Sequence, residues 1–143
     1  EVIGFEEYSA EAIMKGAGLQ DRDPSLTRRE HFRRLRGALL QWAAGEIEGA
    51  ETWEAFNIRV RAAVTDATRD DGRVLVAASG GSIALVLMQV MDLRPDQWIE
   101  FNLQIRNASI TRLVFSSART YVNMFNAIPH LDRPDRKHAE TYS

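Results

Sequence analysis

Ser79, Gly80 and Gly81 are the residues of this sequence whose types and order could bind an anion. They stand between an apolar run at 74–78 and a second apolar stretch at 82–91. Two glycines allow a tight turn, and a helix that begins there directs unpaired N–H groups and its positive dipole end outward. The pattern predicts a phosphate-binding turn at the carboxyl end of a strand. It also fits an ordinary strand-to-helix turn in which Ser79 caps the helix.

The same turn allows a second chemistry, in which Ser79 is a nucleophile. Ala77 and Gly81, two positions before and after it, fit the small-residue elbow that exposes a catalytic serine in hydrolases. His130 or His138 could then act as the base. No convincing oxyanion loop precedes the strand and the chain is short for such a fold, so serine hydrolysis is the weaker alternative.

The overall composition restricts anion recognition to a local site. A formal net charge of -2 gives no field that would attract nucleic acid or an anionic membrane, so we expect neither as a partner. The absence of cysteine excludes disulfides and thiolate chemistry and suits a cytoplasmic protein. The 3 histidines lack a metal-site spacing, and we expect neither a metal nor another cofactor.

Hydrophobic periodicity predicts the elements that would hold the glycine turn. Five helices follow from apolar residues at helical spacing or from capping residues, at 10–15, 25–45, 52–69, 82–91 and 95–101. The apolar run at 74–78 predicts a central strand covered on both faces. Residues 105–115 and 121–126 predict an antiparallel hairpin. This alternation of strands and helices is typical of an α/β domain.

Two further segments are expected to lie at the surface. Residues 16–26 are rich in Gly, Asp and Pro and read as a surface loop. The polar residues 129–143 read as a surface tail. At 143 residues, the chain has the length of one domain, which we assign to residues 1–143.

Several segments resemble the histidine phosphatase, or phosphoglycerate mutase-like, superfamily. Ala78-Ser79-Gly80-Gly81-Ser82-Ile83 is similar to the family's Ser-His-Gly-Gly turn, with Ser79 where the histidine stands. Asn107-Ala108-Ser109-Ile110-Thr111 resembles a downstream strand of many members, and Asn126 with His130-Leu131 resembles the family's ending. Gly4-Phe5-Glu6-Glu7-Tyr8 looks like the segment that carries the acidic proton donor. That donor corresponds best to Glu7, with Glu6 as the alternative register.

This resemblance implies a small phosphomonoester or phosphate ion as the ligand and a phosphohistidine as the intermediate. A histidine in an Arg-His-Gly triplet would attack phosphorus, Glu7 would protonate the leaving oxygen, and Ser79, Gly80 and Gly81 would bind phosphoryl oxygens. In the family that triplet lies upstream of the acidic segment, so we expect the chain as given to be inactive. Ser79 donates only a neutral hydrogen bond where the histidine brings a positive charge. The alternative is a non-catalytic pseudo-phosphatase that acts as a phosphate-binding or interaction module.

The resemblance also implies the fold. We expect a three-layer α/β/α domain with a mixed, mostly parallel sheet, from which the N-terminal strands are missing. Such a sheet would expose a strand edge and apolar surface. We therefore expect the chain to form a homo-oligomer or a strand-exchanged dimer.

Overall fold

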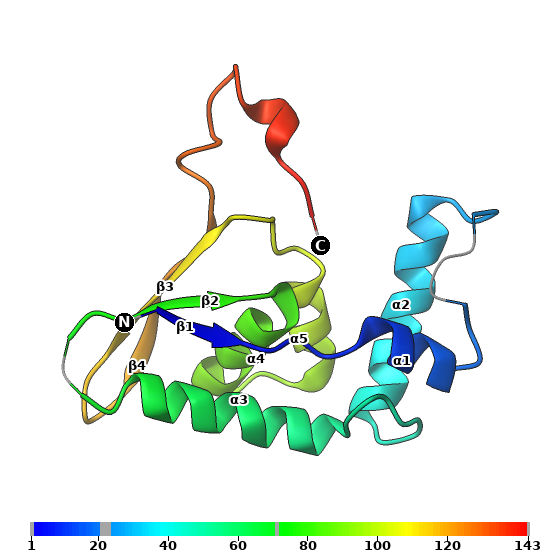
Figure 1. Ribbon diagram of the computed structural model, residues 1–143, viewed down its shortest axis with the longest axis horizontal. Coiled ribbons are helices and arrows are strands. Elements are labelled where there is room, and N and C mark those ends of the chain that lie inside the picture. The colour runs from blue at the N-terminus through cyan, green and yellow to red at the C-terminus, as the bar shows by residue number, and fades with distance from the viewer. Residues whose placement is uncertain (1, 21–23, 71, 143) are drawn as a thin grey trace. The chain divides into compact units, whose positions relative to one another are not determined.

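Figure 1 shows the computed structural model of the chain, which describes residues 2–20, 24–70 and 72–142. Residues 21–23 of the predicted loop, together with residues 1, 71 and 143, lie outside the described residues. The chain divides into two compact units. One takes its described residues from 1–7 and 61–143, and the other from 8–60.

The unit formed by residues 8–60 is helical. It contains α1 (Ala10–Gly16), α2 (Arg28–Ala43) and the first half of α3 (Trp53–Ala67). A capping box begins α2, because Thr27 Oγ1 accepts a hydrogen bond from the Glu30 N–H while the Glu30 carboxylate accepts one from the Thr27 N–H. The helices predicted at 10–15, 25–45 and 52–69 are confirmed, with ends that differ by a few residues.

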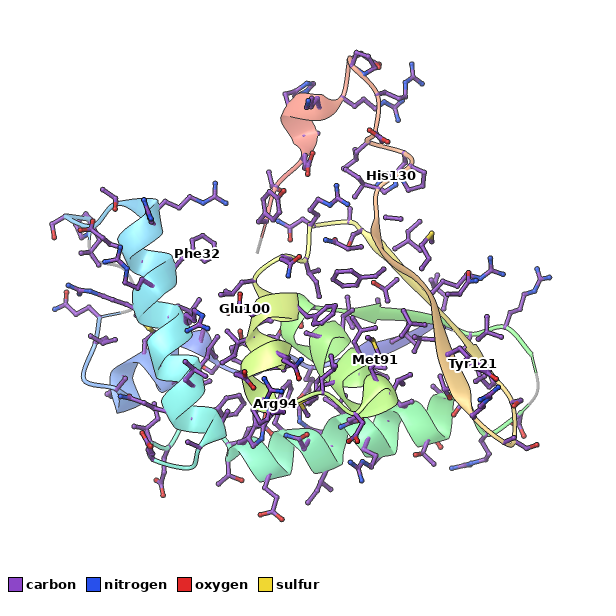
Figure 2. The ribbon with its side chains drawn as sticks, turned by 180° about the vertical axis from the view of Figure 1, so that it is seen from behind. Phe32, Met91, Arg94, Glu100, Tyr121 and His130 are labelled. Carbon is purple, nitrogen blue, oxygen red and sulfur yellow. The ribbon has the colours of Figure 1, made fainter. Side chains whose placement is uncertain are left out.

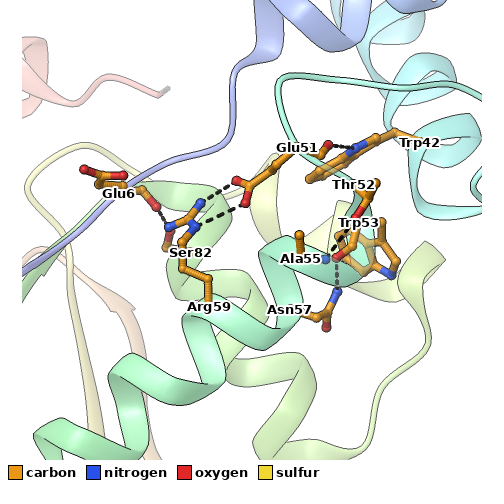
Figure 3. Close-up of polar contacts among 9 residues, drawn as sticks. All are labelled: Glu6, Trp42, Glu51, Thr52, Trp53, Ala55, Asn57, Arg59 and Ser82. Atoms are coloured by element: carbon orange, nitrogen blue, oxygen red, sulfur yellow. Dashed lines mark hydrogen bonds and ion pairs between the residues drawn. The ribbon is translucent and has the colours of Figure 1, made fainter.

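An aromatic cluster forms the core of this unit. Trp42 and Phe56 are buried, with ring centroids 5.6 Å apart, and the rings of Tyr8 and Trp53 pack against both. Figure 3 shows how the loop before α3 is held: Arg59 donates two hydrogen bonds to the Glu51 carboxylate, and Trp42 Nε1 donates to the Glu51 carbonyl at 2.9 Å. A bidentate arginine–carboxylate pair fixes geometry as well as charge.

The other unit contains all the described strands. β1 (Val2–Phe5) pairs in parallel with β2 (Leu75–Ala78), and β3 (Ile110–Phe115) pairs antiparallel with β4 (Thr120–Ala127). Two helices, α4 (Gly80–Met91) and α5 (Pro95–Asn102), pack against each other. Leu85 and Leu87 of α4 and Trp98 and Ile99 of α5 are buried in the core. The protein therefore has a small mixed α/β fold, consistent with a phosphoglycerate mutase-like fold.

The strands differ from the prediction in three ways. The described residues form two separate two-stranded sheets instead of one mixed sheet. β2 is not covered on both faces, because Leu75 is 67% exposed. Residues 2–5 form a strand that the sequence analysis did not predict, and β3 begins at Ile110 rather than at residue 105. Strand formation depends on a partner far along the chain, which local patterning does not reveal.

The segment after β4 is largely exposed and contains a short 3-10 helix, η1 (Lys137–Ala139). It returns to the loop before β3, where Arg106 and Tyr142 form an isolated antiparallel bridge.

Three large apolar residues are exposed on the strands: Leu75, Ile110 and Val114. Self-association through such surface stays a prediction. Within the described residues, no helix combines the length and apolar character needed to cross a membrane.

Candidate functional site

The glycine turn lies where the sequence analysis places it, at the start of a helix. Gly80 and Gly81 are the first two residues of α4, and Ser79 is the N-cap residue. Neither glycine has the positive φ that only glycine tolerates well. A Cβ at position 80 would instead lie 3.2 Å from Asn102 Oδ1 and 3.7 Å from Ile105 Cβ. Gly80 therefore allows Asn102 and Ile105 to approach its backbone closely. This corrects the prediction that the glycine is needed for a tight turn.

Ser79 does not act as a helix cap through its side chain. It has the extended backbone of an N-cap residue, but its hydroxyl makes no capping hydrogen bond. The Ser79 Oγ atom is buried and has no hydrogen-bond partner among the described residues. An unpaired buried hydroxyl is unfavourable by about 1–3 kcal/mol, so a group of this kind calls for an explanation.

Glu7 meets the first turn of α4. Its exposed carboxylate accepts a hydrogen bond from the Gly81 N–H at 2.9 Å. The neighbouring residue reinforces the contact, because the buried Ser82 hydroxyl donates to the Glu6 carbonyl at 2.9 Å, as Figure 3 shows. A carboxylate at a helix N-terminus interacts favourably with the helix dipole. The fold thus brings together Glu7 and the glycine turn, the two segments that sequence analysis assigns to catalysis and phosphate binding.

A tryptophan of α5 also holds the first turn of α4 in place. Trp98 of α5 is fully buried, and its Nε1 donates to the Gly81 carbonyl at 3.0 Å. A buried indole N–H with a good partner both packs and orients the chain it contacts. The first turn of α4 therefore has a defined position relative to β1 and α5.

A pocket of about 490 Å³ adjoins the turn. Ser79 and Gly80 line it at the carboxyl end of β2, and the loop before β3 contributes Arg106 and Ser109. Most of the remaining lining is apolar and comes from α3, α4 and the two strands β2 and β3. Pockets of this size with a few convergent polar groups are typical of small-molecule sites.

Sequence analysis did not single out Arg106, and it named Asn126 only as part of a resemblance, not as the residue that supports Arg106. Asn126 Oδ1 accepts from the Arg106 N–H at 2.9 Å, and the Asn126 carbonyl accepts from the Arg106 guanidinium. Asn126 is buried and has a left-handed backbone, with φ of 55°. The pairing of residues so far apart leaves no trace in local sequence patterns.

The geometry gives no support to Ser79 as a hydrolase nucleophile. His130 lies on the exposed segment after β4 (Figure 2), and His138 is exposed in η1. Neither histidine lines the pocket that holds Ser79. A general base must lie within hydrogen-bond reach of the hydroxyl that it activates, and no described residue does so.

Comparison with protein families decides the relationship. The family model of the histidine phosphatase superfamily (branch 1) matches residues 18–128. The chain belongs to this superfamily. The matched range includes the Ser79-Gly80-Gly81 turn and Arg106 of the candidate histidine phosphatase site but begins after Glu7. Comparisons with curated proteins and with solved structures gave no match.

The superfamily's Arg-His-Gly triplet does not occur in the 143 residues. The histidines are His31, His130 and His138, and each has other neighbours. Within the described part of the chain, no group of three His, Asp or Glu residues is arranged to hold a metal ion. The catalytic role of Glu7 and the phosphate-binding roles of Ser79, Gly80 and Gly81 therefore stay predictions.

Proposed function

We propose that this protein binds the phosphoryl group of a small phosphomonoester at the first turn of α4 and hydrolyses it through a phosphohistidine. The observation that carries the proposal is the contact of the Glu7 carboxylate with the Gly81 N–H at 2.9 Å. It holds a candidate proton donor beside a helix N-terminus, which is a favourable place for phosphate. Membership of the histidine phosphatase superfamily supports the same reaction class.

In this proposal the described residues do two things. Ser79 and the N-terminal end of α4 bind phosphoryl oxygens, and Glu7 gives a proton to the leaving oxygen as its bond to phosphorus breaks. The attacking nitrogen belongs to a histidine outside these 143 residues. Water then attacks the phosphohistidine, which releases orthophosphate and restores the histidine.

A non-catalytic alternative is favoured by one observation, the replacement of the family histidine by Ser79. A neutral hydroxyl stabilises phosphoryl charge less than a cationic donor does, and loss of one such donor lowers rates by on the order of 10²-fold. The same site could then bind phosphate without turning it over.

Steady-state turnover of an aryl phosphate by the complete gene product distinguishes the two. The 143-residue chain serves as the matched control, because it retains the proposed phosphate-binding residues but has no Arg-His-Gly triplet. We expect turnover by the complete product and none by the 143-residue chain. A well-folded complete product that binds orthophosphate but shows no turnover would support the pseudo-phosphatase instead.

A further inference from the structure

Three buried side-chain atoms have no hydrogen-bond partner among the described residues: Ser79 Oγ, Arg106 Nε and Ser109 Oγ. All three residues line the same pocket. Unpaired buried polar atoms are rare, and a cluster of them in one cavity indicates a missing partner. Since a hydroxyl can donate and a guanidinium N–H must donate, the missing partner has hydrogen-bond acceptors.

Arg106 is held in a fixed position at this pocket. Asn126 accepts hydrogen bonds from both the backbone N–H and the guanidinium of Arg106, and the Asn126 amide donates to the Gln104 carbonyl at 2.8 Å. Asn126 is buried, and its left-handed backbone, with φ of 55°, is an unfavourable conformation that the surrounding structure maintains. The guanidinium is therefore oriented before any ligand arrives, so little side-chain entropy is lost on binding.

The charge of Arg106 is only partly balanced. Glu140 of the C-terminal segment contacts one guanidinium nitrogen at 3.3 Å, a long distance for a charged pair, and both side chains are partly exposed. Arg106 is the only charged residue among the described residues that line the pocket. An acceptor that enters this pocket therefore meets a single positive charge beside two neutral hydroxyl groups.

We propose that Arg106 is the cationic phosphate-binding residue of this site and supplies the positive charge that Ser79 lacks. Its Nε–H donates to a phosphoryl oxygen, and the hydroxyl groups of Ser79 and Ser109 donate to the same group. This inference rests on the proposed function, because it assigns a further residue to the same phosphate site. The ligand is orthophosphate or the phosphoryl group of a monoester.

Calorimetric titration of the 143-residue chain with inorganic phosphate tests the assignment. Arg106→Gln should weaken binding by about tenfold or more, the loss expected for one charge-assisted hydrogen bond. Arg112→Gln is the matched control, because Arg112 is an exposed arginine of β3 outside the pocket. It should bind phosphate as the unmodified chain does.

A second measurement needs no variant and so does not depend on the folding of Arg106→Gln. Phosphate should protect Arg106, but not Arg112, from modification by phenylglyoxal, as read by peptide mass spectrometry. Equal phosphate binding by Arg106→Gln, or no protection of Arg106 in a chain that binds phosphate, would overturn the role of Arg106 alone. If the unmodified chain and the complete gene product both fail to bind phosphate, the phosphate site itself is wrong.

Discussion

Glu7 and Gly81 are 74 positions apart, yet the Glu7 carboxylate accepts a hydrogen bond from the Gly81 N–H at 2.9 Å. The parallel pairing of β1 with β2 creates this contact. Phe5 lies opposite Ala78 in the register, so the residues that follow each strand emerge at the same end of the pair. Ligands in α/β proteins bind at the carboxyl ends of parallel strands. The candidate acid and the candidate phosphate turn share this end.

Replacement of the candidate acid tests this arrangement. In the complete gene product, Glu7→Gln should lower phosphomonoester turnover by about 10²-fold or more, because an amide cannot donate the proton that the leaving oxygen requires. The amide oxygen can still accept from the Gly81 N–H, so binding should change less than turnover. Initial rates over a range of aryl phosphate concentrations measure both effects.

Glu6→Gln is the matched control for this variant. Glu6 and Glu7 are adjacent in sequence and both are exposed, but the Ser82 hydroxyl of α4 donates to the backbone carbonyl of Glu6. We expect Glu6→Gln to keep most of the activity. If Glu6→Gln loses turnover and Glu7→Gln does not, the acid is Glu6.

Restoring the family's histidine at position 79 tests the role of charge. Ser79→His should preserve or raise turnover, because an imidazolium is a stronger donor to a phosphoryl oxygen than a hydroxyl. The adjoining pocket of about 490 Å³ leaves room for the ring. Ser79→Ala removes the hydroxyl without adding charge and serves as the comparison. Turnover of Ser79→His below that of Ser79→Ala would show that positive charge at position 79 does not assist turnover.

We expect the Asn126 side chain to stabilise the fold, although the left-handed backbone conformation of this residue is unfavourable. Asn126→Ala leaves the Arg106 N–H and the Gln104 carbonyl without their partner and keeps a left-handed residue, so it should destabilise by about 2–4 kcal/mol. Asn126→Gly loses the same hydrogen bonds but tolerates the positive φ. It should be more stable than the alanine variant by about 1 kcal/mol, as measured by urea unfolding. If Asn126→Ala and Asn126→Gly are equally stable, the backbone conformation at this position does not affect stability.

The capping box of α2 predicts a pH dependence of stability. Hydrogen bonds from Thr27 hold the pKa of Glu30 below its ordinary value, so the folded state favours the ionised carboxylate. The resulting stabilisation is present above the unfolded pKa of about 4.3 and is lost as pH falls through the lower folded pKa. The difference in unfolding midpoint between the unmodified chain and Glu30→Gln should therefore disappear in acid. A difference that persists at pH 3 would contradict this assignment.

The helices of the fold and the location of the glycine turn follow from local sequence patterns. Apolar residues at helical spacing predict α2 and α3, and α2 is capped by Thr27, a residue type favoured at that position. The helix start at Gly80 likewise follows from a strand-like run that ends in Ser-Gly-Gly. Such signals depend on residues within one or two turns of each other, so they can be read directly from the sequence.

Long-range relationships explain what sequence reasoning missed. Residues 2–5 are too few to display strand periodicity, and they form β1 only because β2 lies beside them. Arg106 looks like an ordinary polar loop residue until Asn126, 20 positions later, accepts from its backbone N–H. Strand pairing and buried polar networks depend on neighbours in space, and no window of sequence shows these.

Trapping the covalent intermediate tests the central claim most directly. The complete gene product is mixed with radiolabelled aryl phosphate and stopped in alkaline denaturant, in which a phosphorus–nitrogen bond survives. We predict label on one histidine of the complete product, slower labelling in Glu7→Gln because its leaving oxygen lacks the proton donor, and none on the 143-residue chain. A folded complete product that turns over the substrate without any labelled histidine would contradict the phosphohistidine mechanism.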